Sequence, residues 1–219
     1  MEYTAKGLPK VIHYCWFGRG EKSPLIQRCI ATWREKMPGW EIREWNEDNF
    51  DVTSIPYTAE AYGAKKYAFV ADYARFWILY HFGGVCLCTD VELLRPVDDL
   101  LDETPCLMGF ELRDTINPGS IISAKTIVAY TTEMLRRHGF TGGNRMQQVG
   151  NFVLYPSEYF CPFEHETQMV VKTENTRSIH HFSATWSPWW RKARFRAIGL
   201  AARLLGRERY LALKHCIKK

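Results

Sequence analysis

The sequence lacks any apolar run that would cross a membrane as a helix. No window of its 219 residues approaches the roughly 18 apolar residues that such a helix needs. The first residues also lack a positively charged segment followed by a long apolar stretch, so we expect no secretory signal. Internal repeats and low-complexity tracts are absent as well. A chain of this length is expected to form one domain, with room for a small appendage.

The seven cysteines lack the spacing of a metal site or a disulfide framework. They are odd in number and scattered, and only Cys86 and Cys88 lie close together. Cys-x-Cys is not a zinc-binding spacing. Since we expect no export signal, reduced thiols in a cytosolic protein are the simplest interpretation.

Charge is unevenly distributed along the chain. Residues 191–219 contain ten Lys or Arg and one acid, Glu208, whereas the whole chain has a net charge of only +5. Residues 1–190 are therefore mildly acidic and are followed by a strongly basic tail. Such a tail is typical of an element that binds a polyanion or a membrane surface.

Three interpretations of this tail remain open. In the first, residues 188–219 form a basic amphipathic helix that lies in an anionic membrane interface, because Trp189, Trp190 and Phe195 accompany the basic residues. In the second, the helix packs on the domain with its charges in water. The third, nucleic-acid binding, is disfavoured because the rest of the chain is net acidic and shows no known nucleic-acid motif.

Strand and helix signals alternate along most of the chain, as in an α/β domain. Strands are predicted at 10–16, 40–45, 85–88, 152–155 and 176–181, and helices at 24–37, 59–82, 128–137 and 189–205. Two shorter strand signals lie within 106–122, and the glycine-rich stretch 139–150 is predicted to be a loop. In such sheets the ligand crevice lies beyond the carboxyl ends of the strands, where Trp16 and Asp90 are expected.

Three groups of polar residues carry candidate chemistry. Asp90 and Glu92 follow a buried strand and can hold a divalent cation, although acids at strand ends usually cap the next element or face water. Asp72 and Arg75 share a helix face and can hold sugar hydroxyls and a phosphate, or form an ordinary surface ion pair. The adjacent histidines His180 and His181 can complete a carboxylate metal site or be structural.

Together, these motifs resemble glycosyltransferase family 32, which includes capsular polysaccharide synthesis enzymes and the yeast initiating α-1,6-mannosyltransferase. The matching pieces are LPKVIHYCWFG at 8–18, WNEDNFDV at 45–52, KKYAFVADYARFWILYHFGGV at 65–85, TDVELL at 89–94, YPSEYFCP at 155–162 and IHHFSATW at 179–186. Their order and combination over about residues 8–186 are specific, although each piece alone is not.

The resemblance implies a Rossmann-like GT-A fold of nucleotide-diphospho-sugar transferases over residues 1–187, followed by the basic tail at 188–219. It also implies a nucleotide-sugar donor, a Mn²⁺ or Mg²⁺ ion and retention of anomeric configuration. The catalytic residues that it implies are Asp72, Arg75, Asp90 and Trp186. Of these, Asp72 and Arg75 grip the donor sugar and phosphate, and Trp186 lies on a loop that closes over the donor.

The resemblance also implies the residues that bind the donor and the metal. Trp16 is the aromatic side chain next to the donor base. The other residues assigned to donor binding are His13, Tyr73, Cys88 and Glu92. Asp90 corresponds to the second aspartate of the DxD metal motif, and His181 to the metal ligand near the C-terminal end of the domain.

One residue departs from the family pattern. The family reads Asp-Thr-Asp where this chain reads Cys88-Thr89-Asp90, and a thiol is a poor ligand for Mg²⁺ or Mn²⁺. Glu92 offers a second carboxylate two residues after Asp90, and such residues share a face of a strand. The substitution leaves open a tolerated change, weak metal affinity, a metal-independent enzyme or an inactive one.

The function expected from the sequence is therefore a retaining glycosyltransferase that moves a hexose from a nucleotide-sugar, with a UDP-sugar favoured. The expected acceptor is a lipid-linked oligosaccharide or a polysaccharide, as in capsular polysaccharide biosynthesis. The expected location is the cytoplasmic face of a membrane, with the protein bound peripherally. The alternative is a catalytically impaired relative that still binds nucleotide-sugars.

Overall fold

The structure, a computed structural model, describes residues 2–104, 106–110, 127–183 and 189–217 and is a mixed α/β fold. Its first sheet has three parallel strands in the order β2-β1-β3, with β1 (Val11–Cys15) between β2 (Glu41–Trp45) and β3 (Val85–Cys86). The first four residues of β1 are buried, as a central strand requires. The predicted strands at 10–16, 40–45 and 85–88 are confirmed.

Helix α1 (Pro24–Lys36) begins as the sequence predicts. Ser23 caps it by accepting a hydrogen bond from the Ile26 amide, and Pro24 occupies its first position. The buried face of α1 includes Trp33, whose indole Nε1 donates to the Val91 carbonyl at 2.7 Å. This bond ties α1 to β4 (Val91–Leu93), the strand that follows the candidate acidic motif.

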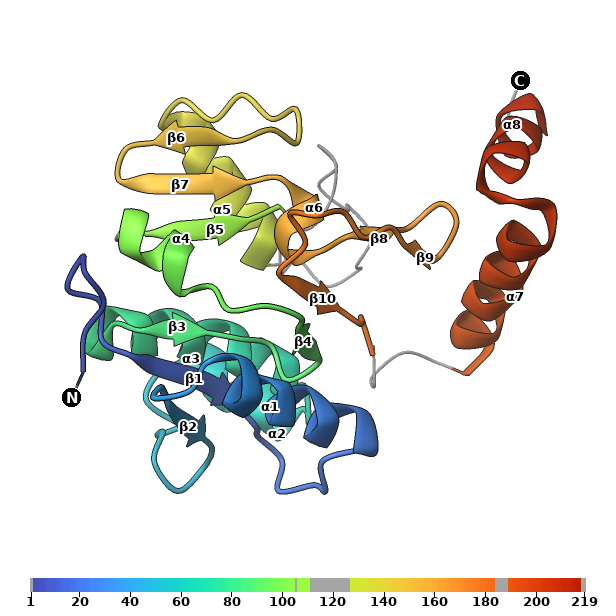
Figure 1. The fold of residues 1–219 in the computed structure, drawn as a ribbon. Coiled ribbons are helices and arrows are strands. Elements are labelled where there is room, and N and C mark those ends of the chain that lie inside the picture. Colours follow the sequence, from blue (N-terminus) through green and yellow to red (C-terminus); the bar gives the residue numbers. More distant parts are fainter. Residues whose placement is uncertain (1, 105, 111–126, 184–188, 218–219) are drawn as a thin grey trace.

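The predicted single helix over 59–82 is wrong, because two helices occupy this stretch. Helix α2 (Pro56–Gly63) ends in a Schellman-type turn, in which the Lys66 amide bonds the Ala61 carbonyl and Lys65 adopts a left-handed φ of 56°. Helix α3 (Tyr67–Phe82) then runs beside the first sheet, behind it in Figure 1. The apolar periodicity continues through the break, so it gave no signal for the turn.

A pair of glycines brings α3 to the sheet. Gly83 ends the helix at a φ of 65°, and Gly84 follows at a φ of 81°. A Cβ at Gly84 would lie 2.6 Å from the Val11 carbonyl oxygen and 3.1 Å from His13 Nε2. Only glycine therefore lets β3 approach β1 this closely.

The second half of the domain contains another three-stranded sheet, in the order β5-β7-β6. Its elements are α4 (Asp98–Glu103), β5 (Leu107–Gly109), α5 (Ile127–Arg137), β6 (Gln147–Val149), β7 (Phe152–Tyr155) and α6 (Ser157–Phe160). The stretch predicted as a loop at 139–150 contains strand β6, which pairs antiparallel with β7. Of the two strand signals within 106–122, the part beyond residue 110 lies outside the described residues.

The chain then returns to the first half. After the hairpin of β8 (Phe163–Glu164) and β9 (Met169–Val170), strand β10 (Ser178–His180) pairs antiparallel with β4. Helices α7 (Trp189–Leu205) and α8 (Arg207–Ile217) follow, and Figure 1 shows them beside the β8–β9 hairpin, away from the two sheets. Arg207 bonds Glu164 at 2.7 Å and so holds the tail to this hairpin.

Three buried clusters form the core. The first packs β1 and α1 against β4 around Trp33, the second packs α3 against Phe17, Trp45 and Phe50, and the third lies around Leu135 and Leu154. All seven cysteines are free thiols. The first two clusters pack on β1 and its neighbours and so lie beneath the strand ends of the first sheet.

Candidate functional site

The site lies where the strands of the first sheet end. Parallel strands present their carboxyl ends at one edge, so Trp16 after β1 and residues 88–90 after β3 emerge on the same side. The Leu87 amide donates to the His13 carbonyl at 3.0 Å and keeps the two chains together past the end of β3. In Figure 1 the short pair β4 and β10 lies at this edge.

Asp90 is the most firmly held residue of the site. It is 9% exposed, and its Oδ1 lies 3.1 Å from His180 Nε2 while its Oδ2 accepts a hydrogen bond from the Ser183 amide at 2.8 Å. Burial by itself raises the pKa of Asp90, but the hydrogen bonds from His180 and Ser183 outweigh it and hold the pKa below its ordinary value. The carboxylate is therefore charged and fixed in place.

An unusual turn at Phe182 brings the Ser183 amide to Asp90. Phe182 has a φ of 47°, a conformation that side-chain-bearing residues rarely adopt. Its ring stacks on the imidazole of His180 with centroids 4.2 Å apart, and the His181 amide bonds the Asp90 carbonyl at 3.0 Å. The segment after β10 is thus folded around the acidic loop.

A second carboxylate–imidazole pair lies beside the first. Glu92 Oε2 is 2.7 Å from His181 Nε2, and both side chains are about one-quarter exposed. The sequence pointed to His181 as the partner of Asp90, whereas the structure brings His180 to Asp90 and His181 to Glu92. Two carboxylates and two imidazoles therefore gather at the β4–β10 edge in separate pairs.

Arg75 and Cys88 meet at the other side of the acidic loop. The Arg75 guanidinium, projecting from α3, lies 3.4 Å from Cys88 Sγ and 3.8 Å from Asp72 Oδ1, so the predicted Asp72–Arg75 pairing is present. Arg75 Nε is buried and has no hydrogen-bond partner among the described residues. Burial raises the pKa of the Cys88 thiol, with Arg75 opposing, so Cys88 is a neutral thiol.

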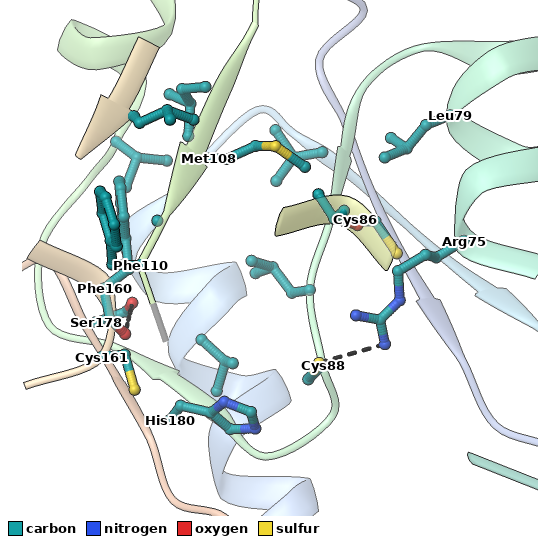
Figure 2. A pocket seen from close by; sticks show the side chains of 18 of the residues that line it. Arg75, Leu79, Cys86, Cys88, Met108, Phe110, Phe160, Cys161, Ser178 and His180 are labelled. Carbon is teal, nitrogen blue, oxygen red and sulfur yellow. Dashed lines mark hydrogen bonds between the residues drawn. The ribbon is translucent and has the colours of Figure 1, made fainter. Parts of the chain in front are cut away.

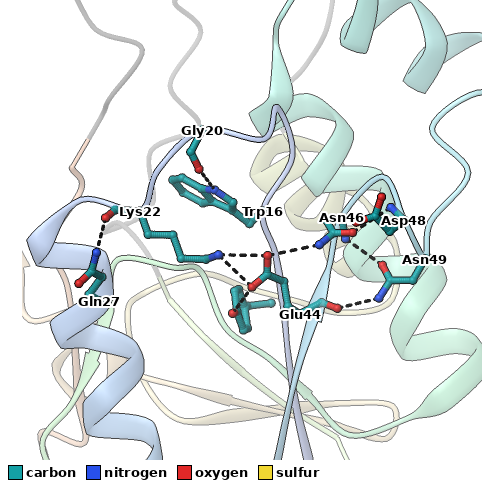
Figure 3. A network of polar contacts seen from close by, with 9 residues as sticks. Trp16, Gly20, Lys22, Gln27, Glu44, Asn46, Asp48 and Asn49 are labelled. Carbon is teal, nitrogen blue, oxygen red and sulfur yellow. Dashed lines mark hydrogen bonds and ion pairs between the residues drawn. The ribbon is translucent and has the colours of Figure 1, made fainter.

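Trp16 belongs to a polar network at the end of β1, drawn in Figure 3. Its indole Nε1 donates to the Gly20 carbonyl at 2.7 Å, and the Lys22 ammonium lies 5.5 Å from the ring centroid. Lys22 in turn pairs with Glu44 at 2.9 Å. The half-buried ring thus has a fixed orientation beside a cation, which suits stacking on a flat ligand with a negative charge nearby.

Three of the predicted residues lie elsewhere or outside the described part. His13 is fully buried and accepts a hydrogen bond from Trp45 Nε1 at 3.0 Å, so its side chain lies within the core rather than in the crevice. Tyr73 packs half-buried against the second core cluster. Trp186 lies outside the described residues.

The carboxylate of Asp90 is a ligand that Mn²⁺ and Mg²⁺ prefer, and an imidazole can complete such a site for Mn²⁺ more readily than for Mg²⁺. In an octahedral site with bonds of 2.0–2.1 Å, neighbouring ligand atoms lie about 3 Å apart. Asp90 Oδ1 and His180 Nε2 are 3.1 Å apart, so both atoms could bind one ion if it displaced the hydrogen bond between them. Among the described residues, however, no three His, Cys, Asp or Glu side chains form a complete metal site. The protein residues thus supply part of a coordination sphere.

Sequence reasoning did not single out two contacts of this site. The sequence presents His180 only as one of a histidine pair and gives Ser183 no role. The run His-His-Phe-Ser at the end of β10 is the available signal, but it does not say which imidazole faces the carboxylate. That choice depends on the β4–β10 register, in which His180 stands opposite Val91.

Comparison with known proteins agrees with this chemistry. Residues 23–107 match the family described as "Glycosyltransferase sugar-binding region containing DXD motif". This range contains α1, α3, β3 and the loop with Asp90. Residues 23–107 are thus similar to a glycosyltransferase sugar-binding region.

Two curated relatives come from Schizosaccharomyces pombe. Inositol phosphoceramide mannosyltransferase 1 is 26% identical over 113 residues, which cover 46% of this chain and 34% of the relative. Inositol phosphoceramide mannosyltransferase 3 is 28% identical over 101 residues, covering 43% of this chain and 27% of the relative. The chain thus spans about a third of the length of these relatives or less. Part of this chain is therefore similar to a glycosyltransferase sugar-binding region and to two proteins named as mannosyltransferases.

Two negative findings accompany these matches. No solved structure matches the chain significantly. Among the helices that the structure describes, none has the length and apolar character needed to cross a membrane.

Proposed function

We propose that this chain is a retaining glycosyltransferase of GT-A fold that moves a hexose from a nucleotide-sugar to a lipid-linked oligosaccharide or polysaccharide acceptor. The contact between Asp90 and His180 at the strand ends carries the proposal, because it holds a charged, oriented carboxylate of the matched region against an imidazole that returns from outside that region. A UDP-sugar is the favoured donor. Because the relatives are named mannosyltransferases, mannose is a second candidate for the transferred hexose.

The donor would lie across the carboxyl ends of β1 and β3. Trp16 offers a fixed aromatic face for the base, with Lys22 beside it. Arg75 offers a guanidinium whose Nε has no hydrogen-bond partner within the described part of the chain, which suits a phosphate oxygen. Asp72 lies on the same helix, 3.8 Å from the guanidinium, where it can accept bonds from sugar hydroxyls.

A Mn²⁺ or Mg²⁺ ion would be held by Asp90 and His180, and His181 would first have to leave Glu92 to join them. When bound, such an ion acts as a Lewis acid that stabilises the charge of a leaving diphosphate. The residues of this chain contribute the rest: Ser183 fixes the Asp90 carboxylate, and Arg75 adds positive charge near the diphosphate.

Transfer would break the bond between C1 of the sugar and the diphosphate oxygen through an oxocarbenium-like state. The acceptor hydroxyl forms its new bond to C1 on the same face, and its proton goes to the departing diphosphate. No protein base is needed in this scheme. An inverted linkage in the product would contradict it.

The location proposed for the reaction is the cytoplasmic face of a membrane, as in capsular polysaccharide synthesis. The tail supports this proposal, because α7 exposes Trp189 at 80% and Leu204 at 78% alongside exposed arginines. A lipid-linked acceptor would be found at the same surface.

The second candidate function is binding of nucleotide-sugars without turnover. Cys88 favours it, because a neutral thiol beside Arg75 replaces a carboxylate of the DXD motif. Such a chain would bind a nucleoside diphosphate but neither hydrolyse nor transfer the sugar.

The decisive experiment measures donor hydrolysis by purified protein over a panel of UDP- and GDP-sugars, with Mn²⁺, with Mg²⁺ and with EDTA. We expect metal-dependent turnover of one donor. Nucleotide binding without turnover in every condition would instead support the second candidate, and absence of both would refute the two together.

A further inference from the structure

A cavity of about 450 Å³ lies next to the candidate site. Its walls come from β3, β4 and β5 and from helices α3 and α5, so it lies where the two halves of the domain face each other. Figure 2 shows Leu79, Cys86 and Met108 near one side of this space and Cys88 and His180 near another. Its volume is within the range of roughly 300–1,000 Å³ that small-molecule sites occupy.

The lining is mostly apolar. Leu79 and Phe76 come from α3, Leu87 follows β3, and Met108 and Phe110 come from β5 and its end. One of the polar lining groups is already bonded within the protein, because Ser178 Oγ donates to the Phe160 carbonyl at 2.9 Å. Apolar space that the described residues leave unfilled lowers stability in proportion to its volume, so an occupant with matching surface stabilises this chain.

The chemistry of the lining selects the class of occupant. A nucleobase or a sugar buried here would lose hydrogen bonds to water without replacing most of them, which is costly. A linear aliphatic chain has no such groups and gains free energy with each methylene that it buries. The cavity therefore suits an acyl or prenyl chain.

The cavity is continuous with the candidate site. Arg75, Cys88 and His180 line it, and His180 is the residue that contacts Asp90. A lipid whose chain fills the cavity would thus hold its polar headgroup beside the acidic loop. We infer that this cavity binds the aliphatic chain of the lipid acceptor, an inference that rests on the proposed function for the identity of that lipid.

The first test uses a probe without a sugar. A dansyl-labelled undecanoic acid is titrated into the full-length protein and then displaced by straight-chain fatty acids from octanoic to hexadecanoic acid, each below its micelle concentration. We expect the affinity to rise roughly fourfold per methylene and then to level off once the chain outgrows the cavity. An affinity that does not depend on chain length would overturn the inference.

Substitutions in the cavity test whether the probe binds there. Met108→Trp and Leu79→Trp fill it and should weaken probe binding at least roughly tenfold, whereas Met134→Trp, the matched control on α5, should not. Met134 is 44% exposed and does not line the cavity. Binding that survives Met108→Trp but is lost in Leu200→Glu/Leu204→Glu would put the probe on α7 and refute the inference.

Thermal unfolding shows whether the filled variants are still folded. Filling an empty apolar cavity should leave the melting temperature of Met108→Trp equal to or above that of the parent protein. A clear fall in the melting temperature of both filled variants, with Met134→Trp unchanged, would mean that the space is not open to a ligand. That result would overturn the inference.

Donor hydrolysis separates this inference from the proposed function. We expect Met108→Trp to hydrolyse the donor at the parental rate while losing transfer to alkyl-chain acceptors. If the protein binds the probe with the expected chain-length dependence but hydrolyses no donor, aliphatic-chain binding in the cavity is supported and the proposed function is contradicted. If it hydrolyses a donor but does not bind the probe, the proposed function is supported and the inference about the cavity is contradicted.

Discussion

Asp90 and His180 face each other across the antiparallel pair of β4 and β10, with Oδ1 and Nε2 3.1 Å apart. The two residues are 90 positions apart in the chain, and only the return of β10 to the first sheet joins them. His181, the next residue, turns instead to Glu92 at 2.7 Å. The register of two short strands thus decides which imidazole contacts Asp90.

The first prediction follows from this register. His180→Ala should weaken Mn²⁺ binding, measured by isothermal titration with a nucleoside diphosphate present, by at least roughly tenfold. His181→Ala should have a smaller effect, because its partner in the structure is Glu92. His138→Ala, on an exposed histidine, is the matched control. A larger loss for His181→Ala than for His180→Ala would show that the two pairs rearrange when metal binds.

The second prediction concerns the missing aspartate. Cys88→Asp replaces a neutral thiol by a carboxylate, a ligand that Mn²⁺ and Mg²⁺ prefer. We expect metal-dependent donor hydrolysis to rise and the dissociation constant for Mn²⁺ to fall about tenfold, worth about 1.4 kcal/mol.

Arg75 sets the limit of that gain, because it lies 3.4 Å from Cys88 Sγ and would pair with a new carboxylate. Cys88→Asn, with the same shape and no charge, is the control. If Asp and Asn give equal activity and metal affinity, the first position of the motif does not contact the metal in this chain.

Much of the fold could be predicted from the sequence, because its signals are local. Ser23 and Pro24 mark the start of α1, and the apolar run at 10–16 marks β1. The break between α2 and α3 could not be predicted in this way. It depends on Lys65 adopting a left-handed conformation, and lysine carries no preference for that conformation.

The candidate site could be predicted only in part. Asp72 and Arg75 pair on α3, and α3, the glycine turn and β3, which the sequence indicates, bring Arg75 to Cys88, two residues before Asp90. The contact of Asp90 with His180 depends on strand register, which sequence spacing does not fix. His13 was predicted to bind the donor and instead lies in the core. Its imidazole can be buried there because the Trp45 indole donates a hydrogen bond to it, and the sequence does not reveal that partner.

The third prediction uses this buried histidine. Burial, followed by the positive charge of Arg43, lowers the pKa of His13 from 6.5 to about 4. Between these values the unfolded chain binds a proton that the folded chain refuses, so the free energy of unfolding falls as the pH drops from about 6.5 to about 4. The loss amounts to about 3 kcal/mol. Above pH 6.5 this group should contribute no pH dependence.

Urea unfolding at several pH values measures this effect. His13→Gln keeps an acceptor for Trp45 Nε1 and should remove the extra pH dependence between pH 4 and 6.5. It should also lower the stability at neutral pH, because the glutamine side chain packs less well in the core. His138→Gln, on an exposed histidine, should retain the parental slope. Equal slopes for His13→Gln and the parent protein would show that His13 titrates normally in the folded chain.

The last prediction concerns the tail. One side of α7 packs on the domain, where Gly199 lies against Gln168 and Ala202 is buried, while Leu200 and Leu204 are 59% and 78% exposed. The exposed apolar side chains lie on a helix with exposed arginines, which suits an anionic lipid surface. We expect the protein to float with vesicles rich in phosphatidylglycerol and to float less well as salt is raised.

Substitution on the outward face separates membrane binding from packing on the domain. Leu200→Glu/Leu204→Glu should abolish flotation, because each leucine contributes at least about 1.5 kcal/mol on insertion, roughly tenfold in partitioning. Val171→Glu, an exposed apolar position outside the tail, is the control and should float like the parent protein. Since neither leucine supports the core, the melting temperature should be unchanged. Undiminished flotation of the double variant would mean that α7 only packs on the domain and keeps its charges in water.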